Sequence, residues 1–224
     1  MQTVLPETSL RRDPGSTLIK IGRLAALLLL IMSASMSAYG AVTEPLALVQ
    51  QSSEKMLSAI KAERAEIDKD TARLFVLVED IVLPHFDFRR MAKLVLGKYW
   101  HRASDDQRRR FTDEFRFLLV RTYATAMLEY TDQKIIYLPF RSKPDATDVV
   151  VQTEVEQDGG FPIPIDYKLS LSDGAWKVYE VAIDGVGLVI NYRSSFSTEI
   201  RGEGGLDALI KKLKLRNDEA RKNQ

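Results

Sequence analysis

Residues 162–172 read Pro162-Ile-Pro-Ile-Asp-Tyr-Lys-Leu-Ser-Leu-Ser172, with an apolar side chain at every second position. Neighbouring side chains of a β-strand point to opposite faces of the sheet. The segment is therefore predicted to form a strand with one apolar face and one polar face. Such alternation is typical of an antiparallel sheet that packs on one side and meets water on the other.

Three more strands are predicted around this one. They are Lys134–Phe140, Asp148–Glu156 and Trp176–Ile183. Short segments rich in Gly, Pro and Asp separate the strands, at Lys143-Pro-Asp145, Asp158-Gly-Gly160 and Ser172-Asp-Gly174. Because connections this short join antiparallel neighbours, this part of the chain predicts a four-stranded antiparallel sheet.

Helical periodicity dominates the chain from Thr43 to Tyr130 and returns after the sheet. Ser104-Asp-Asp-Gln107 is a capping box that begins the clearest helix, predicted to run to Met127. The other predicted helices are Pro45–Ile60, Asp68–Asp80, Phe86–Leu96, Asn191–Ile200 and Leu206–Leu215. This order of elements indicates an α+β fold, with N-terminal and C-terminal helices. The expected arrangement, with helices packed on one face of a curved four-stranded sheet, resembles an NTF2-like cone.

The first forty residues have the layout of a secretory signal peptide. Basic residues up to Arg23 precede the apolar run Leu24–Met32, and the small-residue stretch Ser33–Gly40 follows. We therefore predict that residues 1–40 are removed on export, leaving a single α+β domain at 41–217 and a polar C-terminal tail at 218–224. A retained membrane anchor is the alternative, although such an anchor needs about 20 apolar residues.

The composition excludes several classes of function. The chain has 224 residues, no cysteine and two histidines, which excludes disulfide scaffolds, thiolate metal sites and cysteine nucleophiles. Without residues 1–40, 28 basic residues remain against 29 acidic residues, so the net charge gives no support for binding to nucleic acid. Neither a cofactor nor a metal site is predicted.

A possible nucleophile motif occurs twice in the first predicted helix. Ser52-Ser-Glu-Lys55 and Ser58-Ala-Ile-Lys61 both match the serine–lysine pattern of acyl-transfer enzymes. The sequence lacks the companion Ser-Asp-Asn and Lys-Thr-Gly motifs, and two matches in one amphipathic helix indicate coincidence. No catalytic residue is predicted from this pattern.

A distinctive combination of residues extends from the helical half to the end of the chain. It comprises Phe86-Asp-Phe-Arg-Arg-Met-Ala-Lys-Leu-Val-Leu-Gly97, Trp100, Phe111, Phe115, Arg121-Thr-Tyr123, Asp184-Gly-Val186, Asn191-Tyr-Arg193 and Phe196. In this combination the chain, from about Pro45 to Leu215, resembles the MlaC family of periplasmic phospholipid-binding proteins, also called toluene-tolerance auxiliary proteins.

The resemblance implies a soluble periplasmic carrier rather than an enzyme. Its cargo would be a phospholipid, and its partners the periplasmic component of an inner-membrane ABC transporter and an outer-membrane lipoprotein–porin complex. A monomer that maintains outer-membrane lipid asymmetry is expected. Acyl chains need such a carrier in water, because hiding each CH₂ is worth about 0.8 kcal/mol.

A lipid carrier needs interior space that its own side chains leave unfilled. Small or β-branched strand residues opposite a long apolar helix leave such space, so the lipid-binding candidates lie on both. The helix candidates are Phe115, Leu119, Thr122 and Met127, and the strand candidates are Val149, Val151, Val155, Ile163, Ile165, Tyr167, Leu169 and Val178. The alternative for each residue is an ordinary place in the packed core.

Two other classes of function remain open from the residues. A small-molecule isomerase or dehydratase on a similar cone would use Asp166 or Tyr167 as its acid–base group, although the acidic strand residues alternate outward. An exported binding module would dock another protein through its arginine-rich helix. The candidate docking residues are Arg108, Arg109, Arg110 and Arg116, which otherwise form a solvated helix face.

Overall fold

The alternating segment forms β3 (Ile163–Ser172), the middle strand of a five-stranded antiparallel sheet in the order β1-β2-β3-β4-β5. The computed structural model describes residues 44–128, 134–157, 159–202 and 204–222, which belong to one unit, Val42–Gln224. The predicted signal peptide at 1–40 lies outside the described residues. The other strands are β1 (Ile135–Tyr137), β2 (Asp148–Val155), β4 (Ala175–Ile183) and β5 (Val186–Gly187).

The prediction of an antiparallel sheet is confirmed, but its count of four strands is one too low. The extra strand, β5, pairs its two residues with Ala182 and Ile183 of β4. The intervening turn places Asp184 and Gly185 at φ 51° and 75°, as a two-residue hairpin with both central residues at positive φ requires. Two residues are too few to show alternation, so periodicity gave no signal for β5.

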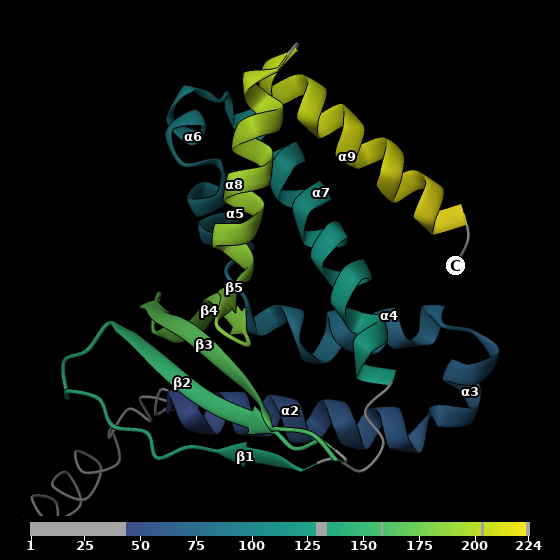
Figure 1. Cartoon of the computed structure of the whole chain (residues 1–224), viewed down its shortest axis with the longest axis vertical. Helices are drawn as coiled ribbons and strands as arrows, with labels where there is room; N and C mark the ends of the chain where they lie inside the picture. Colours follow the sequence, from purple (N-terminus) through teal and green to yellow (C-terminus); the bar gives the residue numbers. More distant parts are fainter. Residues whose placement is uncertain (1–43, 129–133, 158, 203, 223–224) are drawn as a thin grey trace, which may run out of the picture. The chain divides into compact units, whose positions relative to one another are not determined.

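The helices occupy two regions of the unit (Figure 1). In the first group α2 (Pro45–Ala62) contacts β2, and α3 (Arg64–Lys69) and α4 (Ala72–Ile81) follow it along the chain. The 3₁₀ turn η1 (Leu83–His85) comes after α4 and contacts β4. In the second group, called here the distal helices, α5 (Phe88–Leu96), α7 (Asp105–Ala124), α8 (Leu188–Arg201) and α9 (Gly205–Lys222) pack on one another. Of these helices, α5 and α8 also contact β4. The short α6 (Lys98–Arg102) follows α5, and the 3₁₀ turn η2 (Thr125–Leu128) follows α7.

An aromatic cluster holds the distal helices together. The Phe111 and Phe115 rings of α7 stack with centroids 5.7 Å apart, and Phe196 of α8 meets both rings edge-on. Tyr192 lies 5.4 Å from both Phe115 and Phe196. Burying aromatic rings of this size contributes more per residue than most core contacts, so this cluster is a principal source of stability.

The prediction of one helix over Asp68–Asp80 is wrong, because the chain breaks there into α3 and α4. Asp70 has extended backbone angles, φ −145° and ψ 103°. Its side-chain Oδ1 accepts a hydrogen bond from the Ala72 N–H at 2.9 Å, at the start of α4. Aspartate commonly competes with helical hydrogen bonding in this way, which explains the interruption.

The chain also remains helical beyond the predicted end of the last helix. α9 continues to Lys222, through most of the segment 218–224 that we predicted as a polar tail. Asn217 is fully buried, and its Nδ2 donates to the Glu114 backbone oxygen at 3.0 Å and to Glu114 Oε2 at 2.7 Å. Arg221 then places its guanidinium 3.9 Å from the Phe117 ring centroid. These contacts with α7 stabilise the polar end of α9, which its composition alone does not predict.

A buried carboxylate joins the sheet to the distal helices. Glu180 of β4 accepts hydrogen bonds at Oε1 from the N–H groups of Val181 and Val189, at 3.1 and 2.9 Å. Val189 lies in the first turn of α8, where N–H groups lack helical partners and a negative charge is favourable. A Cβ atom at Gly187 would lie 3.0 Å from Glu180 Oε2, so a glycine suits this close approach.

The capping box at the start of α7 is confirmed and supports a stability prediction. Ser104 Oγ accepts from the Gln107 N–H at 3.2 Å, and Gln107 Oε1 accepts from the Ser104 N–H at 2.9 Å. We expect Ser104→Ala to lower the free energy of unfolding by about 1 kcal/mol. Urea denaturation measures this change, and Ser58→Ala, at an exposed position within α2, is the control expected to cost nothing. Equal unfolding midpoints for the two variants would contradict the capping role.

Candidate functional site

A cavity of about 790 Å³ lies between the apolar face of the sheet and the helices α2, α4 and α7. Its size falls within the roughly 300–1,000 Å³ typical of sites for small organic ligands. Most of its lining side chains are aliphatic or aromatic, with a few polar groups from Ser52, Ser53, His85, Glu156 and Gln157. Such a cavity suits a largely apolar ligand.

The sheet forms one wall of the cavity. Alternate residues of β3 and the facing residues of β4 point into it, because antiparallel pairing sets Ile165 opposite Ile183 and Tyr167 opposite Val181. The remaining wall residues on the sheet are Ile135, Val155, Ile163 and Val178. This wall is the apolar face that the alternation at residues 162–172 predicts.

The opposite wall consists of helical residues, most of which were not among the predicted lipid-binding residues. The residues of α2 that line the cavity are Leu48, Val49, Ser52, Ser53, Met56 and Leu57. Those of the α4–η1 segment are Val78, Val82, Leu83 and His85. A signal for α2 existed in the sequence. Ser53 lies within an otherwise apolar stripe, and a small polar residue at such a position indicates a face that is not tightly packed.

Seven of the twelve predicted lipid-binding residues line the cavity. They are Leu119, Met127, Val155, Ile163, Ile165, Tyr167 and Val178. The structure brings them together from β2, β3, β4, α7 and η2, over more than fifty residues of sequence.

The other five predicted residues lie elsewhere. Phe115 belongs to the aromatic cluster. Thr122 is exposed, and its hydroxyl donates to the Leu118 carbonyl at 2.8 Å. The next residue, Tyr123, lines the cavity instead. Val149, Val151 and Leu169 do not line the cavity; they are buried in the core under the sheet, which borders the cavity at Val49 and Val178. Alternation identifies the face of a strand but not the position along it at which packing ends.

Tyr167 is the most strongly perturbed group on the cavity wall. Burial, above all, raises its pKa to about 12, although a hydrogen bond with Thr153 acts in the opposite direction. The phenol therefore stays neutral at physiological pH. Asp166 does not join it, because Gln152 Nε2 donates to Asp166 Oδ1 at 3.1 Å among exposed groups, and Asp166 does not line the cavity. The two residues named for acid–base chemistry are thus separated by the sheet.

His85 is the one histidine on the cavity wall. Partial burial, followed by the positive charges of Lys177 and Lys55, holds the pKa of its imidazole below the usual 6.5. His85 is therefore neutral at pH 7, and its ring offers one hydrogen-bond donor and one acceptor.

Most of the predicted docking arginines already form ion pairs within the protein. Three of the four are paired with carboxylates: Arg108 with Asp105, Arg109 with Asp106, and Arg110 with Asp106 and Asp207. Arg116 is exposed and has no ion-pair partner among the residues placed by the structure. Because Asp207 lies on α9, the Arg110 bridge also links two helices.

The described segments contain neither a membrane-spanning helix nor a cluster of metal-binding side chains. Within residues 44–128, 134–157, 159–202 and 204–222, no helix combines the length and apolar character needed to span a bilayer. The same segments contain no group of three or more His, Asp or Glu side chains arranged to hold a metal ion.

Comparison with known proteins assigns the chain to a family. A sequence model of the family described as "MlaC protein" matches residues 50–215. The chain belongs to the MlaC family. The intermembrane phospholipid transport system binding protein MlaC of Haemophilus influenzae is 30% identical over 77% of this chain and 82% of its own length. Toluene tolerance protein ttg2D of Pseudomonas putida is 27% identical over 76% of this chain and 80% of its own.

A solved structure supports the same assignment. The phospholipid-binding protein of Ralstonia solanacearum, determined in complex with a phospholipid, matches with a TM-score of 0.73 and 33% identity. The match covers 79% of this chain and 98% of the other. Two of these names describe phospholipid binding or transport, one describes toluene tolerance, and none describes an enzyme.

The residues that carried the resemblance to the MlaC family belong mainly to the distal helices. Trp100, Phe111, Phe115 and Phe196 are all buried in the core of α5, α7, α8 and α9. Gly97 ends α5 at φ 52°, and a Cβ atom there would lie 3.1 Å from the Arg193 Nη2. The family signature therefore marks the helical core more than the cavity wall.

The lowered pKa of His85 leads to a prediction about pH. In the unfolded chain His85 takes up a proton as the pH falls through 6.5, whereas in the folded chain it does so only at a lower pH. Protonation therefore favours the unfolded state. We expect the stability contributed by neutral His85 to be complete above pH 6.5 and to be lost as the pH falls through its lower folded pKa. Urea unfolding of refolded protein between pH 7.5 and 5 measures it. His85→Gln should flatten the decline relative to His101→Gln, an exposed control, whereas parallel curves would contradict the assignment.

Proposed function

We propose that this protein is a periplasmic carrier of phospholipid that shields acyl chains within the cavity under its sheet. The observation that carries the proposal is the cavity of about 790 Å³ with its predominantly apolar lining. The relatives support it, since one is a phospholipid transport system binding protein and another was solved with a phospholipid bound.

The energetics require a carrier of this kind. At about 0.8 kcal/mol per CH₂, moving one long acyl chain into water costs on the order of 10 kcal/mol. A protein that crosses an aqueous compartment with a lipid must therefore enclose the chains. Three different elements provide these apolar surroundings, with Ile165 from β3, Val181 from β4 and Met56 from α2.

We further propose that the carrier moves lipid between an inner-membrane ABC transporter and an outer-membrane lipoprotein–porin complex. Release cannot be spontaneous at useful rates when burial holds the ligand by roughly 10 kcal/mol, so a partner must open the cavity or accept the chains directly. Docking would use local charges, because the protein is nearly neutral. Arg116 is the candidate with a free guanidinium, whereas Arg108, Arg109 and Arg110 would have to exchange their present carboxylate partners.

The first test is occupancy. We expect protein purified from a bacterial periplasm without added lipid to carry glycerophospholipid in near-stoichiometric amount. Mass spectrometry of organic extracts, normalised to protein, measures this content. A lipid content no higher than that of an unrelated periplasmic protein purified in parallel would contradict the proposal.

The second test fills the cavity. Ile165 lines the cavity, so Ile165→Trp should enter ligand space and lower the bound lipid while the protein still folds. Leu169 lies on the same strand and face but is fully buried in the packed core, so Leu169→Trp should instead lower the free energy of unfolding by about 1–3 kcal/mol. Lipid content and urea unfolding of the delipidated proteins are compared. Similar destabilisation by both variants would show that Ile165 faces packed core.

A further inference from the structure

The cavity has two chemically different ends, and the strand register locates each end along the sheet. On β3 it begins at Ile163, which pairs with Val155 of β2, and on β4 it reaches Val178, which pairs with Leu169. Ile163 and Leu169 are six residues apart on one strand, a distance of about 20 Å. The ends are called here the hairpin end, at Ile163, and the basic end, at Val178.

The basic end is fixed by main-chain contacts. Phe86 forms a parallel bridge with Val178, and the Asp87 N–H donates to the Val178 carbonyl at 2.9 Å. His85, the residue before Phe86, therefore lies at this end and lines the cavity. Lys177 extends to the same place, because its Nζ donates to the Pro84 carbonyl at 2.5 Å.

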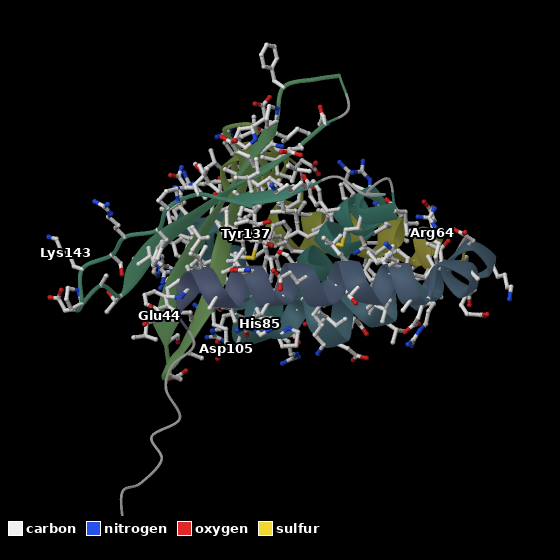
Figure 2. All side chains as sticks on the ribbon, turned by 90° about the horizontal axis from the view of Figure 1, so that it is seen from below. Glu44, Arg64, His85, Asp105, Tyr137 and Lys143 are labelled. Carbon is white, nitrogen blue, oxygen red and sulfur yellow. The ribbon has the colours of Figure 1, made fainter. Side chains whose placement is uncertain are left out.

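A second lysine reaches the basic end from α2. Ser52 lines the cavity, and Lys55 lies three residues later, on the neighbouring position of the same helix face. The charges of Lys55 and Lys177 both lower the pKa of His85, as expected for groups at the same end of the cavity. In Figure 2, His85 lies along α2 on the side opposite Tyr137, a residue of β1.

These cations are not neutralised. Neither Lys55 nor Lys177 has a carboxylate partner in the part of the chain that the structure describes, and the neighbouring Glu54 accepts instead from Gln50 Nε2 at 2.8 Å. At the hairpin end, by contrast, Glu156 lines the cavity, with its backbone N–H bonded to the carbonyl of Lys134 at 2.9 Å. The wall at the hairpin end therefore carries a carboxylate.

We propose that the basic end, formed by Lys55, His85 and Lys177, binds the phosphate of the phospholipid headgroup while the acyl chains extend toward the hairpin end. This inference rests on the proposed carrier function. A phosphodiester carries one negative charge and accepts several hydrogen bonds, and two ammonium groups with one imidazole N–H match it. Lys55 is exposed and His85 half-buried, so the headgroup reaches solvent here while the chains stay covered.

The test compares two ligands with the same acyl chains, of which only one carries a phosphate-containing headgroup. Dioctanoyl phosphatidylglycerol and dioctanoylglycerol, below their micellar concentrations, are titrated into delipidated full-length mature protein and followed by native mass spectrometry. The variant Lys55→Gln/Lys177→Gln should bind the phospholipid roughly tenfold more weakly, as expected for loss of charged hydrogen bonds. The dissociation constant of the same variant for dioctanoylglycerol should stay within about twofold of the wild-type value.

Matched controls make the result specific. Lys93→Gln/Lys211→Gln removes the same charge from exposed positions on α5 and α9 and should change neither affinity. Because Lys177 bonds to Pro84, the single variant Lys55→Gln is measured as well; it breaks no hydrogen bond present in the described structure and should show an intermediate loss for phosphatidylglycerol only. Circular dichroism checks that each variant is folded.

Each outcome decides a different point. Equal loss for both ligands, or no loss for either, overturns the phosphate site while leaving the carrier function intact. Failure of the wild-type protein to bind either ligand overturns the carrier function itself. A third arm titrates inorganic phosphate alone, and Lys55-dependent binding of free phosphate as tight as that of the lipid would overturn a headgroup site in favour of a phosphate-ion site.

Discussion

The apolar face of the sheet must be kept from water, and the protein meets this requirement in two ways. Around Val149, Val151 and Leu169 the face is covered by direct packing, with Val49 of α2 closing the core. Along Ile163, Ile165 and Tyr167 the helices stand off from the sheet and leave the cavity. An unfilled apolar surface of this size is unfavourable in water and favourable around a hydrocarbon chain. The placement of α2 against the sheet thus contributes both to the packed core and to the cavity.

Stability and ligand binding depend on largely separate groups of residues. The aromatic rings of α7 and α8 pack with α5 and α9 at a distance from most of the cavity wall. Only a few side chains, among them Leu119 and Met91, belong to both. A well-packed helical core compensates for an interior that is incompletely packed elsewhere. Glu180 connects the two regions through one buried carboxylate.

The sequence was sufficient for the class of fold and for the sheet face, but not for the cavity outline. The alternation at 162–172 and the capping box at Ser104 depend on local geometry, so both were predictable from neighbouring residues. The break at Asp70 and the two-residue β5 were not, because a side-chain hydrogen bond and a very short pairing leave no periodic signal. Phe115 and Leu169 were assigned to the ligand because an apolar residue looks the same in sequence whether it faces packed atoms or space. The α2 wall arises from tertiary placement, and Ser53 was its only local sign.

The concentration of family-defining residues in the distal helices has an evolutionary consequence. Trp100, Gly97 and Phe196 are constrained by close packing, so exchange at these positions is costly. Residues such as Ile135, Leu57 and Ala126 border open space, and substitutions there alter its outline with little loss of stability. Homologous chains can therefore diverge in the cargo they accept while remaining recognisable from their helices. Assigning cargo among paralogues will require comparison of the wall positions rather than of total sequence identity.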